Sequence, residues 1–174
     1  MEISNRIDDN ISTAAYEAAL RSFGAELQQV EDTLEITRIL TRYGLAVDSN
    51  DVDAVAELYT DNTVIDLGVG SQFHGVAGAR ALITDHRHQA IAGRCAHMLG
   101  PLDVRIDGDT ATATGYMRVY VKNLSSGAVE LYRLSFTRFD LVRVGREWRI
   151  ARRVARVLGD PEASQLFGDA LEEI

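Results

Sequence analysis

Residues 39–62 read ILTRYGLAVDSNDVDAVAELYTDN, and this stretch decides how the rest of the chain is interpreted. Apolar residues recur at helical spacing until polar residues from Asp48 onward break the pattern. Asn50 followed by Asp53 is a capping arrangement, which predicts a short helix over 51–59. The stretch therefore predicts a long helix that ends at an aspartate and is followed at once by a short helix.

The helical pattern continues from this stretch toward the N-terminus. An alanine-rich stripe over 12–30 and a stronger apolar stripe over 31–47 both have helical spacing. The pattern leaves open whether the two segments form one continuous helix or two helices joined at a kink. We expect residues 1–30 to be a helical extension that serves oligomer contacts, and residues 31–158 to form the main domain.

Toward the C-terminus the pattern changes from helices to strands. Two short strands are expected at 63–67 and 72–74, and a helix at 76–91. Long strands are expected over 95–106, 110–122, 129–144 and 147–157, and a last helix over 161–171 within a C-terminal tail of residues 159–174. Turn residues such as Asp107-Gly108-Asp109 join the long strands, so we expect antiparallel hairpins. The apolar parity changes at Gly100-Pro101, which predicts a bulge there.

This order of elements indicates an α+β fold. A curved antiparallel sheet wrapped over helices forms a cone with an internal pocket. The chain has 174 residues, which is the size of one domain. At that size folding buries roughly 70% of the surface of the unfolded chain, enough for a core and a pocket.

Composition excludes several classes of partner. The net charge of −8 argues against nucleic acid and anionic membrane surfaces as main partners. No apolar run approaches the roughly 20 residues that a membrane-spanning helix needs, and the N-terminal residues have no signal-peptide pattern. A single cysteine, Cys95, excludes an intrachain disulfide and fits a reducing compartment. We therefore expect a cytoplasmic protein that acts on a small molecule.

Two residues are candidates for acid–base chemistry. Asp48 follows apolar residues at the end of the long helix, where the helix dipole favours a cationic partner such as an imidazolium. His97 lies near the start of a long strand, on the face that Cys95 and Leu99 share, and an imidazole there suits proton transfer. Each residue alone also fits a structural role, as a loop aspartate between two helices and as a satisfied core histidine.

Other side chains are candidates for lining the pocket. Arg153 lies on the last strand between the small residues Ala151 and Ala155, as a cavity wall would require; the alternative is an exposed arginine on an edge strand. Five tyrosines are candidates for orienting a substrate hydroxyl or carbonyl: Tyr43, Tyr59, Tyr116, Tyr120 and Tyr132.

The remaining histidines form no metal-binding pattern. His86 and His88 are two positions apart on an expected helix, so their side chains diverge, and His74 lies elsewhere in the sequence. Motifs for zinc, phosphate loops and nucleophilic serines are absent from the sequence. We therefore expect neither a metal nor a cofactor.

Several runs resemble the SnoaL-like domain, a branch of the nuclear transport factor 2-like (NTF2-like) superfamily. These runs are ILTRYGLAVD (39–48), VDAVAELYTDN (52–62), FHGVAG (73–78), His97 followed by DGDTA (107–111), and GREWRI (145–150). The resemblance covers about residues 31–158 and implies the cone-shaped α+β fold.

Within that superfamily the chain resembles scytalone dehydratases and hexachlorocyclohexane dehydrochlorinases. These enzymes place an aspartate at the end of the long helix and a histidine at the start of the long strand, which are Asp48 and His97 here. The dehydrochlorinases also carry an arginine shortly after the last-strand tryptophan, which falls on Arg153. The resemblance implies a cofactor-independent, dehydratase-like lyase that acts on a small hydrophobic or polyketide-like molecule. His97 would remove a proton from carbon, Asp48 would orient His97, and Arg153 with a tyrosine would stabilise the leaving group or an oxyanion.

Two alternatives remain at this point. An isomerase or cyclase would use the same Asp48–His97 dyad on a different bond. A non-catalytic ligand-binding domain, or a partner subunit of an oxygenase, would use the cone without chemistry, and a His97 that lies apart from Asp48 would favour it. For every alternative we expect a homo-oligomer, either a dimer or a trimer.

Overall fold

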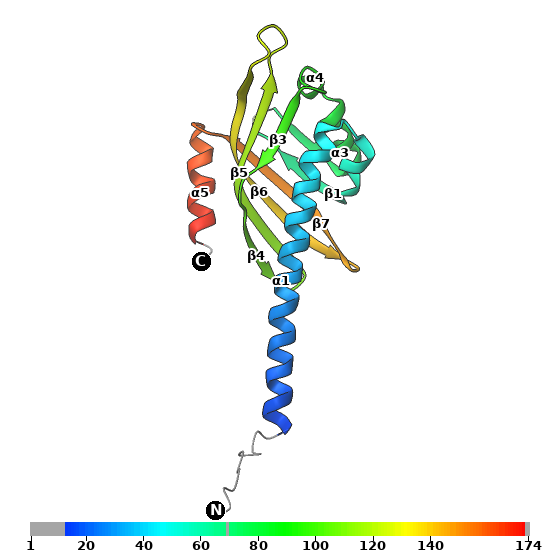
Figure 1. Cartoon of the computed structure of the whole chain (residues 1–174), viewed down its shortest axis with the longest axis vertical. Helices are drawn as coiled ribbons and strands as arrows, with labels where there is room; N and C mark the ends of the chain where they lie inside the picture. The colour runs from blue at the N-terminus through cyan, green and yellow to red at the C-terminus, as the bar shows by residue number, and fades with distance from the viewer. Residues whose placement is uncertain (1–12, 69, 173–174) are drawn as a thin grey trace, which may run out of the picture. The chain divides into compact units, whose positions relative to one another are not determined.

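The computed structural model describes residues 13–68 and 70–172 (Figure 1). The chain divides into two compact units, residues 1–32 and residues 33–174, of which the second contains the sheet. Helix α1 (Thr13–Asp48) is one continuous helix across 36 residues, so the alternative of a kink between two helices is wrong. No helix in the described part of the chain is long and apolar enough to cross a membrane.

The first unit is described from Thr13 onward, and there it is helical. Its side chains up to Glu31 are exposed, including the apolar Tyr16, Leu20 and Phe23. Local contacts one helical turn apart stabilise it, such as the 3.8 Å ion pair between Arg21 and Glu17.

The described part of the second unit contains four further helices, and three of them differ from expectation. Helix α2 (Val52–Glu57) is capped by Asp51, whose side chain accepts a hydrogen bond from the Ala54 amide, and not by Asn50. Asn50 instead has a φ of 57°, the left-handed conformation that commonly ends a helix. The helix expected over 76–91 is divided at Asp85, which is extended and whose side chain accepts a hydrogen bond from the Arg87 amide. The remaining helices are α3 (Gly75–Thr84), α4 (His86–Gln89) and α5 (Pro161–Glu172).

Seven strands form a single sheet. They are β1 (Tyr59–Asp66), β2 (Gln72–His74), β3 (Cys95–Leu99), β4 (Asp103–Asp107), β5 (Thr110–Lys122), β6 (Val129–Val144) and β7 (Glu147–Val157). The sheet order is β2-β1-β7-β6-β5-β3, and β4 also pairs with β5. The α+β cone is confirmed, but the sheet is mixed, because β1 pairs with β7 in parallel. These two strands lie far apart in sequence, so no hairpin turn imposes an antiparallel pairing on them.

The strand expected over 95–106 is interrupted between β3 and β4. The Gly100 amide still donates a 2.8 Å hydrogen bond to the Tyr116 carbonyl, but Pro101 has no amide hydrogen to continue the ladder. On the facing strand, a side chain at Gly115 would lie 2.9 Å from the Pro101 carbonyl, so the two backbones approach closely there. The bulge predicted at Gly100-Pro101 is therefore a complete break, which ends β3 and changes the direction of the chain before β4 begins.

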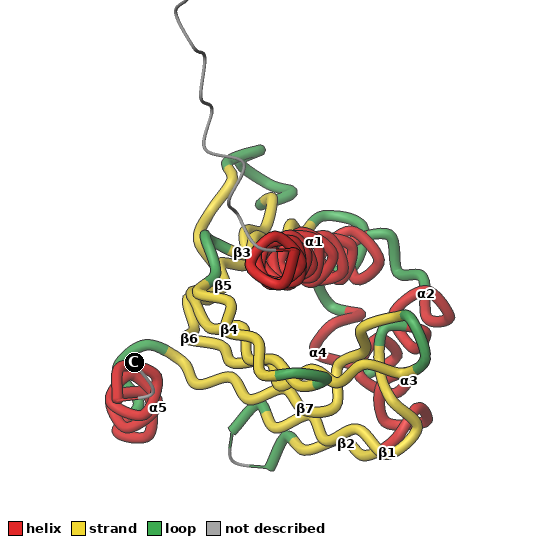
Figure 2. The backbone as a smooth tube through the Cα atoms, turned by 90° about the horizontal axis from the view of Figure 1, so that it is seen from below, coloured by secondary structure: helices red, strands yellow, loops and turns green. Residues whose placement is uncertain are grey.

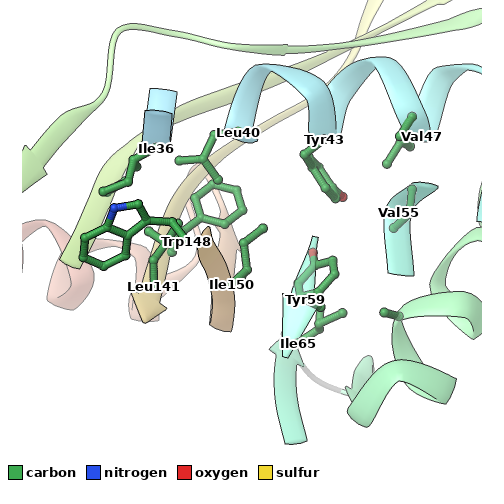
Figure 3. Packing of buried hydrophobic residues seen from close by; sticks show 14 of the residues in the cluster. Ile36, Leu40, Tyr43, Val47, Val55, Tyr59, Ile65, Leu141, Trp148 and Ile150 are labelled. Carbon is green, nitrogen blue, oxygen red and sulfur yellow. The ribbon is translucent and has the colours of Figure 1, made fainter. Parts of the chain in front are cut away.

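The core fills the concave side of the sheet, where the sheet curves around the C-terminal part of α1 (Figure 2). One face of α1 presents Ile36, Leu40 and Tyr43 to Trp148 and Ile150 of β7 (Figure 3). On the opposite side of the sheet lies α5, whose Phe167 ring packs edge-to-face against Phe136, with ring centres 4.7 Å apart, and tilted against Tyr116, with ring centres 5.8 Å apart. The concave side is therefore where the sheet and helices enclose space for a ligand.

Candidate active site

Gly44 allows the C-terminal end of α1 to pack closely against β3. A side chain at Gly44 would lie 2.6 Å from the His97 carbonyl oxygen, so only a residue without one allows the two backbones to approach this closely. Beyond Gly44 the helix terminates at Asp48, and the Asp51 amide donates to the Ala46 carbonyl at 3.0 Å. This packing places the side chain of Asp48 beside β3.

Asp48 makes three contacts to β3 residues. Its Oδ2 accepts a 2.8 Å hydrogen bond from the His97 amide, and its Oδ1 lies 2.6 Å from His97 Nδ1. The Cys95 thiol donates to the same Oδ1 at 3.5 Å. Because one carboxylate contacts both the backbone and the ring of His97, the orientation of the imidazole is fixed. The structure thus brings together the helix-end aspartate and the strand-start histidine.

The environment of His97 favours the neutral form of its imidazole. Burial lowers the pKa of His97 below its ordinary value, Asp48 opposes this in part, and Arg153 and His88 add to the lowering. An ionised carboxylate only accepts hydrogen bonds, so the ring proton lies on Nδ1 and the lone pair lies on Nε2. A neutral histidine held in this tautomer has the geometry of a general base, with its acceptor nitrogen directed away from Asp48.

His97 lines a cavity of about 630 Å³, a volume typical of small-molecule sites. Most of the wall is apolar and comes from α1, α3, β5 and β6. The residues used below that line it are Tyr43, Asp85, Arg87, His88, His97, Met117, Val119, Tyr132, Arg133 and Arg153.

Arg153 belongs to the buried wall of this cavity, with 5% of its surface exposed. Strand β7 lies between β1 and β6, so the alternative of an exposed arginine on an edge strand is wrong. The guanidinium donates to the Tyr43 hydroxyl and, at 3.3 Å, to the Met117 sulfur, and its carbon lies 4.8 Å from the Tyr43 ring centre. Its Nε atom has no partner.

The five candidate tyrosines are divided between the two sides of the sheet. Tyr43 and Tyr132 line the cavity, and Tyr59 lies buried behind Tyr43, with the rings at 86° (Figure 3). Tyr116 and Tyr120 do not line it, which corrects their assignment to the pocket. Side chains alternate along β5, so that Met117 and Val119 face the cavity and these two tyrosines face the other side.

Arg133 and His88 are among the cavity residues that were not predicted from the sequence. Arg133 lies an even number of residues from the buried Phe139, so both side chains are on the same face of β6. This alternation could have predicted that Arg133 faces the cavity. His88 was considered only as a metal ligand, yet its ring centre lies 6.0 Å from that of His97 and its buried Nε2 has no partner. Burial lowers the pKa of His88, and a hydrogen bond to the Val47 backbone opposes this in part.

Asp48, Cys95 and His97 offer potential metal-ligand atoms within 4.8 Å of one another. Two of these atoms, Oδ1 of Asp48 and Nδ1 of His97, are already joined by a hydrogen bond. Burial, together with the nearby carboxylate, raises the pKa of the Cys95 thiol to about 11, whereas metal ligation requires the thiolate. The donor set fits a proton-transfer dyad better than it fits a metal ion.

The sequence matches the SnoaL-like domain family over residues 28–154. Uncharacterized proteins of Mycobacterium bovis and Mycobacterium tuberculosis are 32% identical to it over 132 residues, which cover 72% of this chain and 85% of each relative. An NTF2-like protein with a cystatin-like fold from Novosphingobium aromaticivorans superposes with a TM-score of 0.79 at 34% identity, covering 84% of this chain and 96% of that one.

Two solved structures that are named for an enzymatic activity share this fold at low sequence identity. A hexachlorocyclohexane dehydrochlorinase has a TM-score of 0.67 at 13% identity and covers 76% of this chain and 89% of its own. A protein assigned by name as a scytalone dehydratase, from Novosphingobium aromaticivorans, has a TM-score of 0.65 at 12% identity and covers 74% of this chain and 85% of its own. At these identities the likeness concerns the fold alone.

Proposed function

The chain belongs to the SnoaL-like domain family, and from this premise we propose that it is a cofactor-independent, dehydratase-like lyase in which Asp48 and His97 act as an acid–base dyad. The observation that carries the proposal is the 2.6 Å contact between Asp48 Oδ1 and His97 Nδ1 at the wall of a largely apolar cavity. The non-catalytic alternative predicted a His97 that lies apart from Asp48, so this contact supports catalysis.

The proposed reaction begins at a carbon next to a carbonyl group. His97 Nε2 takes the proton, and the electron pair of the C–H bond becomes a double bond as the bond to the neighbouring hydroxyl breaks. The imidazolium then returns its proton to the leaving hydroxide, which departs as water and regenerates neutral His97. Asp48 stabilises the imidazolium during this cycle, as an aspartate does in other acid–base dyads.

Arg153 and Tyr43 are proposed to stabilise the negative charge that develops on the carbonyl oxygen. The guanidinium is buried and already oriented by the Tyr43 hydroxyl, so little reorganisation is needed when charge appears. The proposed substrate is a small hydrophobic or polyketide-like β-hydroxy ketone, which suits the apolar wall.

The test is dehydration of 3-hydroxy-1-tetralone, which yields 1-naphthol and water and is followed by naphthol fluorescence. We expect the wild type to accelerate the reaction, and Asp48→Asn and His97→Ala each to lower the rate by about 10²–10⁴-fold with an unchanged circular dichroism spectrum. His86→Ala is the matched control, because the side chain of His86 is 88% exposed.

Two results would contradict the proposal. The first is wild-type turnover in either dyad variant. The second is a wild type that does not accelerate dehydration of this ketone. Exchange of the C2 hydrogens with deuterium in the absence of water loss would instead favour the isomerase or cyclase alternative.

A further inference from the structure

The cavity wall on β6 and β7 carries two positive charges for which residues 13–68 and 70–172 supply no carboxylate partner. Arg153 is buried, and its partners are uncharged groups, the Tyr43 hydroxyl and the Met117 sulfur. Burial lowers the pKa of Arg153, but the nearby Tyr43 and Tyr59 outweigh this effect and raise it overall. Arg133 is half-buried and donates a 3.4 Å hydrogen bond to the Leu67 carbonyl, also an uncharged group. Burial, together with the charge of Arg153, lowers the pKa of Arg133, as expected when two cations lie near one another without an anion.

The carboxylates of Asp48 and Asp85, which lie at or beside the cavity, form hydrogen bonds with residues other than Arg133 and Arg153. Asp48 is bonded to His97. Asp85 is the one acidic residue among the described residues that line the cavity, and it forms a two-fold contact with Arg87, at 2.8 and 3.1 Å. A buried guanidinium without a carboxylate is costly, because burial removes its hydration and the described acceptors that replace the water carry no charge.

Unpartnered polar atoms gather at the same cavity. Arg133 Nε, Arg153 Nε and His88 Nε2 are all buried, and no described group forms a hydrogen bond with any of them. Folded proteins pair about nine in ten buried polar groups, so three unpaired nitrogens around one cavity indicate that their partner is a ligand.

We propose that the substrate carries a carboxylate that binds to Arg133, beside the Arg153 guanidinium that is assigned to the carbonyl oxygen. This inference rests on the proposed function, since it names the substrate class for the same cavity. A planar carboxylate accepts two parallel hydrogen bonds from a guanidinium, and one negative charge suits a cavity whose remaining wall is mostly apolar. The rest of the substrate is expected to be an apolar ring system.

The register of the sheet relates this anion site to the base. His97 on β3 is the neighbour of Val119 on β5, and Val119 is the neighbour of Arg133 on β6. All three line the cavity, so one row of the sheet places the base and a cation on the same wall. A carboxylate held by Arg133 would therefore fix the distance from the anion to the carbon that His97 deprotonates.

The test compares 1-naphthoate with 1-naphthamide, which have nearly the same shape and differ in charge. Binding to the full chain is measured by isothermal titration calorimetry. We expect naphthoate to bind at least about tenfold more tightly, as a charged hydrogen-bonded pair does. The net charge of −8 repels anions in general, so this preference would report on the cavity arginines.

Arg133→Met should remove most of the preference for naphthoate and leave naphthamide binding unchanged. Arg133→Gln is the second variant, in case the methionine disturbs folding, and the melting temperature of each is measured. Arg146→Met is the matched control, because it changes the net charge equally at the exposed turn between β6 and β7, and Arg146 does not line the cavity.

Four outcomes would overturn the inference. They are equal binding of naphthoate and naphthamide, no naphthoate binding up to its solubility limit, an Arg146→Met effect as large as that of Arg133→Met, and tighter binding of 1-naphthyl phosphate than of naphthoate. The binding assay needs no turnover. Dyad-dependent dehydration without a naphthoate preference would thus refute only the carboxylate, and a preference without dehydration would refute only the lyase.

Discussion

The two polar regions of the cavity differ in how their charges are satisfied. At the junction of α1 and β3, each carboxylate oxygen of Asp48 accepts a hydrogen bond from the chain. On β6 and β7, Arg133 and Arg153 each keep a buried nitrogen without a partner. At the first region the chain itself supplies the partners of the charged group. At the second region a bound anion would have to supply them. In the proposed reaction the first region holds the base, and the second presents cations to the substrate carboxylate and to the developing oxyanion.

The largest expected effect is a pair of stability changes of opposite sign. Asp48→Ala leaves the His97 amide without an acceptor and should cost about 1–3 kcal/mol of unfolding free energy. Arg153→Met removes an unneutralised buried charge and should stabilise the protein by about 1–4 kcal/mol while activity falls. Both are measured by urea denaturation, and a strongly destabilised Arg153→Met would remove the contrast between the two regions.

A second prediction breaks the paired region by moving its backbone. In Gly44→Ala the new methyl group would lie 2.6 Å from the His97 carbonyl, so β3 must shift, at a cost of about 1–3 kcal/mol and with loss of dehydration. Gly24→Ala is the matched control, because no atom lies within 4 Å and an exposed helical alanine should stabilise by up to about 1 kcal/mol. Equal melting temperatures for the two variants would contradict the close approach.

The third prediction concerns pH. Burial lowers the pKa of His97 below 6.5. At a pH between the folded and unfolded pKa values, the unfolded chain therefore binds a proton at His97 that the folded chain does not bind. The stability that this contributes is present above pH 6.5 and is lost as the pH falls from 6.5 toward the folded pKa. The same ionisation should give the acidic limb of kcat/KM, below pH 6.5.

Asp48 raises the pKa of His97, so Asp48→Asn should move that limb further toward acid, in addition to lowering the rate. Since burial also lowers the pKa of His88, the stability curve is compared with that of His97→Gln to isolate one histidine. A limb at or above pH 6.5, or one that moves toward alkaline pH in Asp48→Asn, would be inconsistent with a neutral buried base.

The smallest expected effects separate the two sides of the sheet. Tyr116→Phe and Tyr120→Phe should each change the dehydration rate by less than about twofold, because surface hydroxyls away from the site contribute little. Tyr43→Phe removes the acceptor that orients Arg153 and should lower kcat more than it changes KM. A larger loss in Tyr116→Phe than in Tyr43→Phe would show that the tyrosine assignment needs revision.

Local patterns were enough to predict the long strands and the positions of Asp48 and His97. The bounds of β5, β6 and β7 agree with expectation because Gly-containing turns mark their ends. The end of the long helix was readable because polar residues follow it directly. That Asp48 would reach His97 depended on a resemblance, since no local rule joins residues 49 positions apart.

Features that depend on long-range pairing were less predictable. The parallel contact of β1 with β7 has no hairpin to announce it. The tyrosines of β5 were assigned to the cavity although the strand alternates. Tyr116 and Tyr120 share the polar face with Arg118, whereas the apolar Met117 and Val119 face the cavity. Arg133 was overlooked because a single arginine in a strand usually faces solvent, and only the burial of its same-face neighbours shows otherwise.

The row from His97 through Val119 to Arg133 has a consequence for substrate length. Neighbouring strands are about 4.8 Å apart, so two steps across the sheet separate the base from the cation by about 10 Å between Cα atoms. Backbone hydrogen bonds set this spacing, and no side-chain substitution alters it. The strand spacing therefore sets the distance between the acidic C–H bond and the negative charge of the substrate. Homologues with the same row of residues should vary more in the ring system they accept than in this distance.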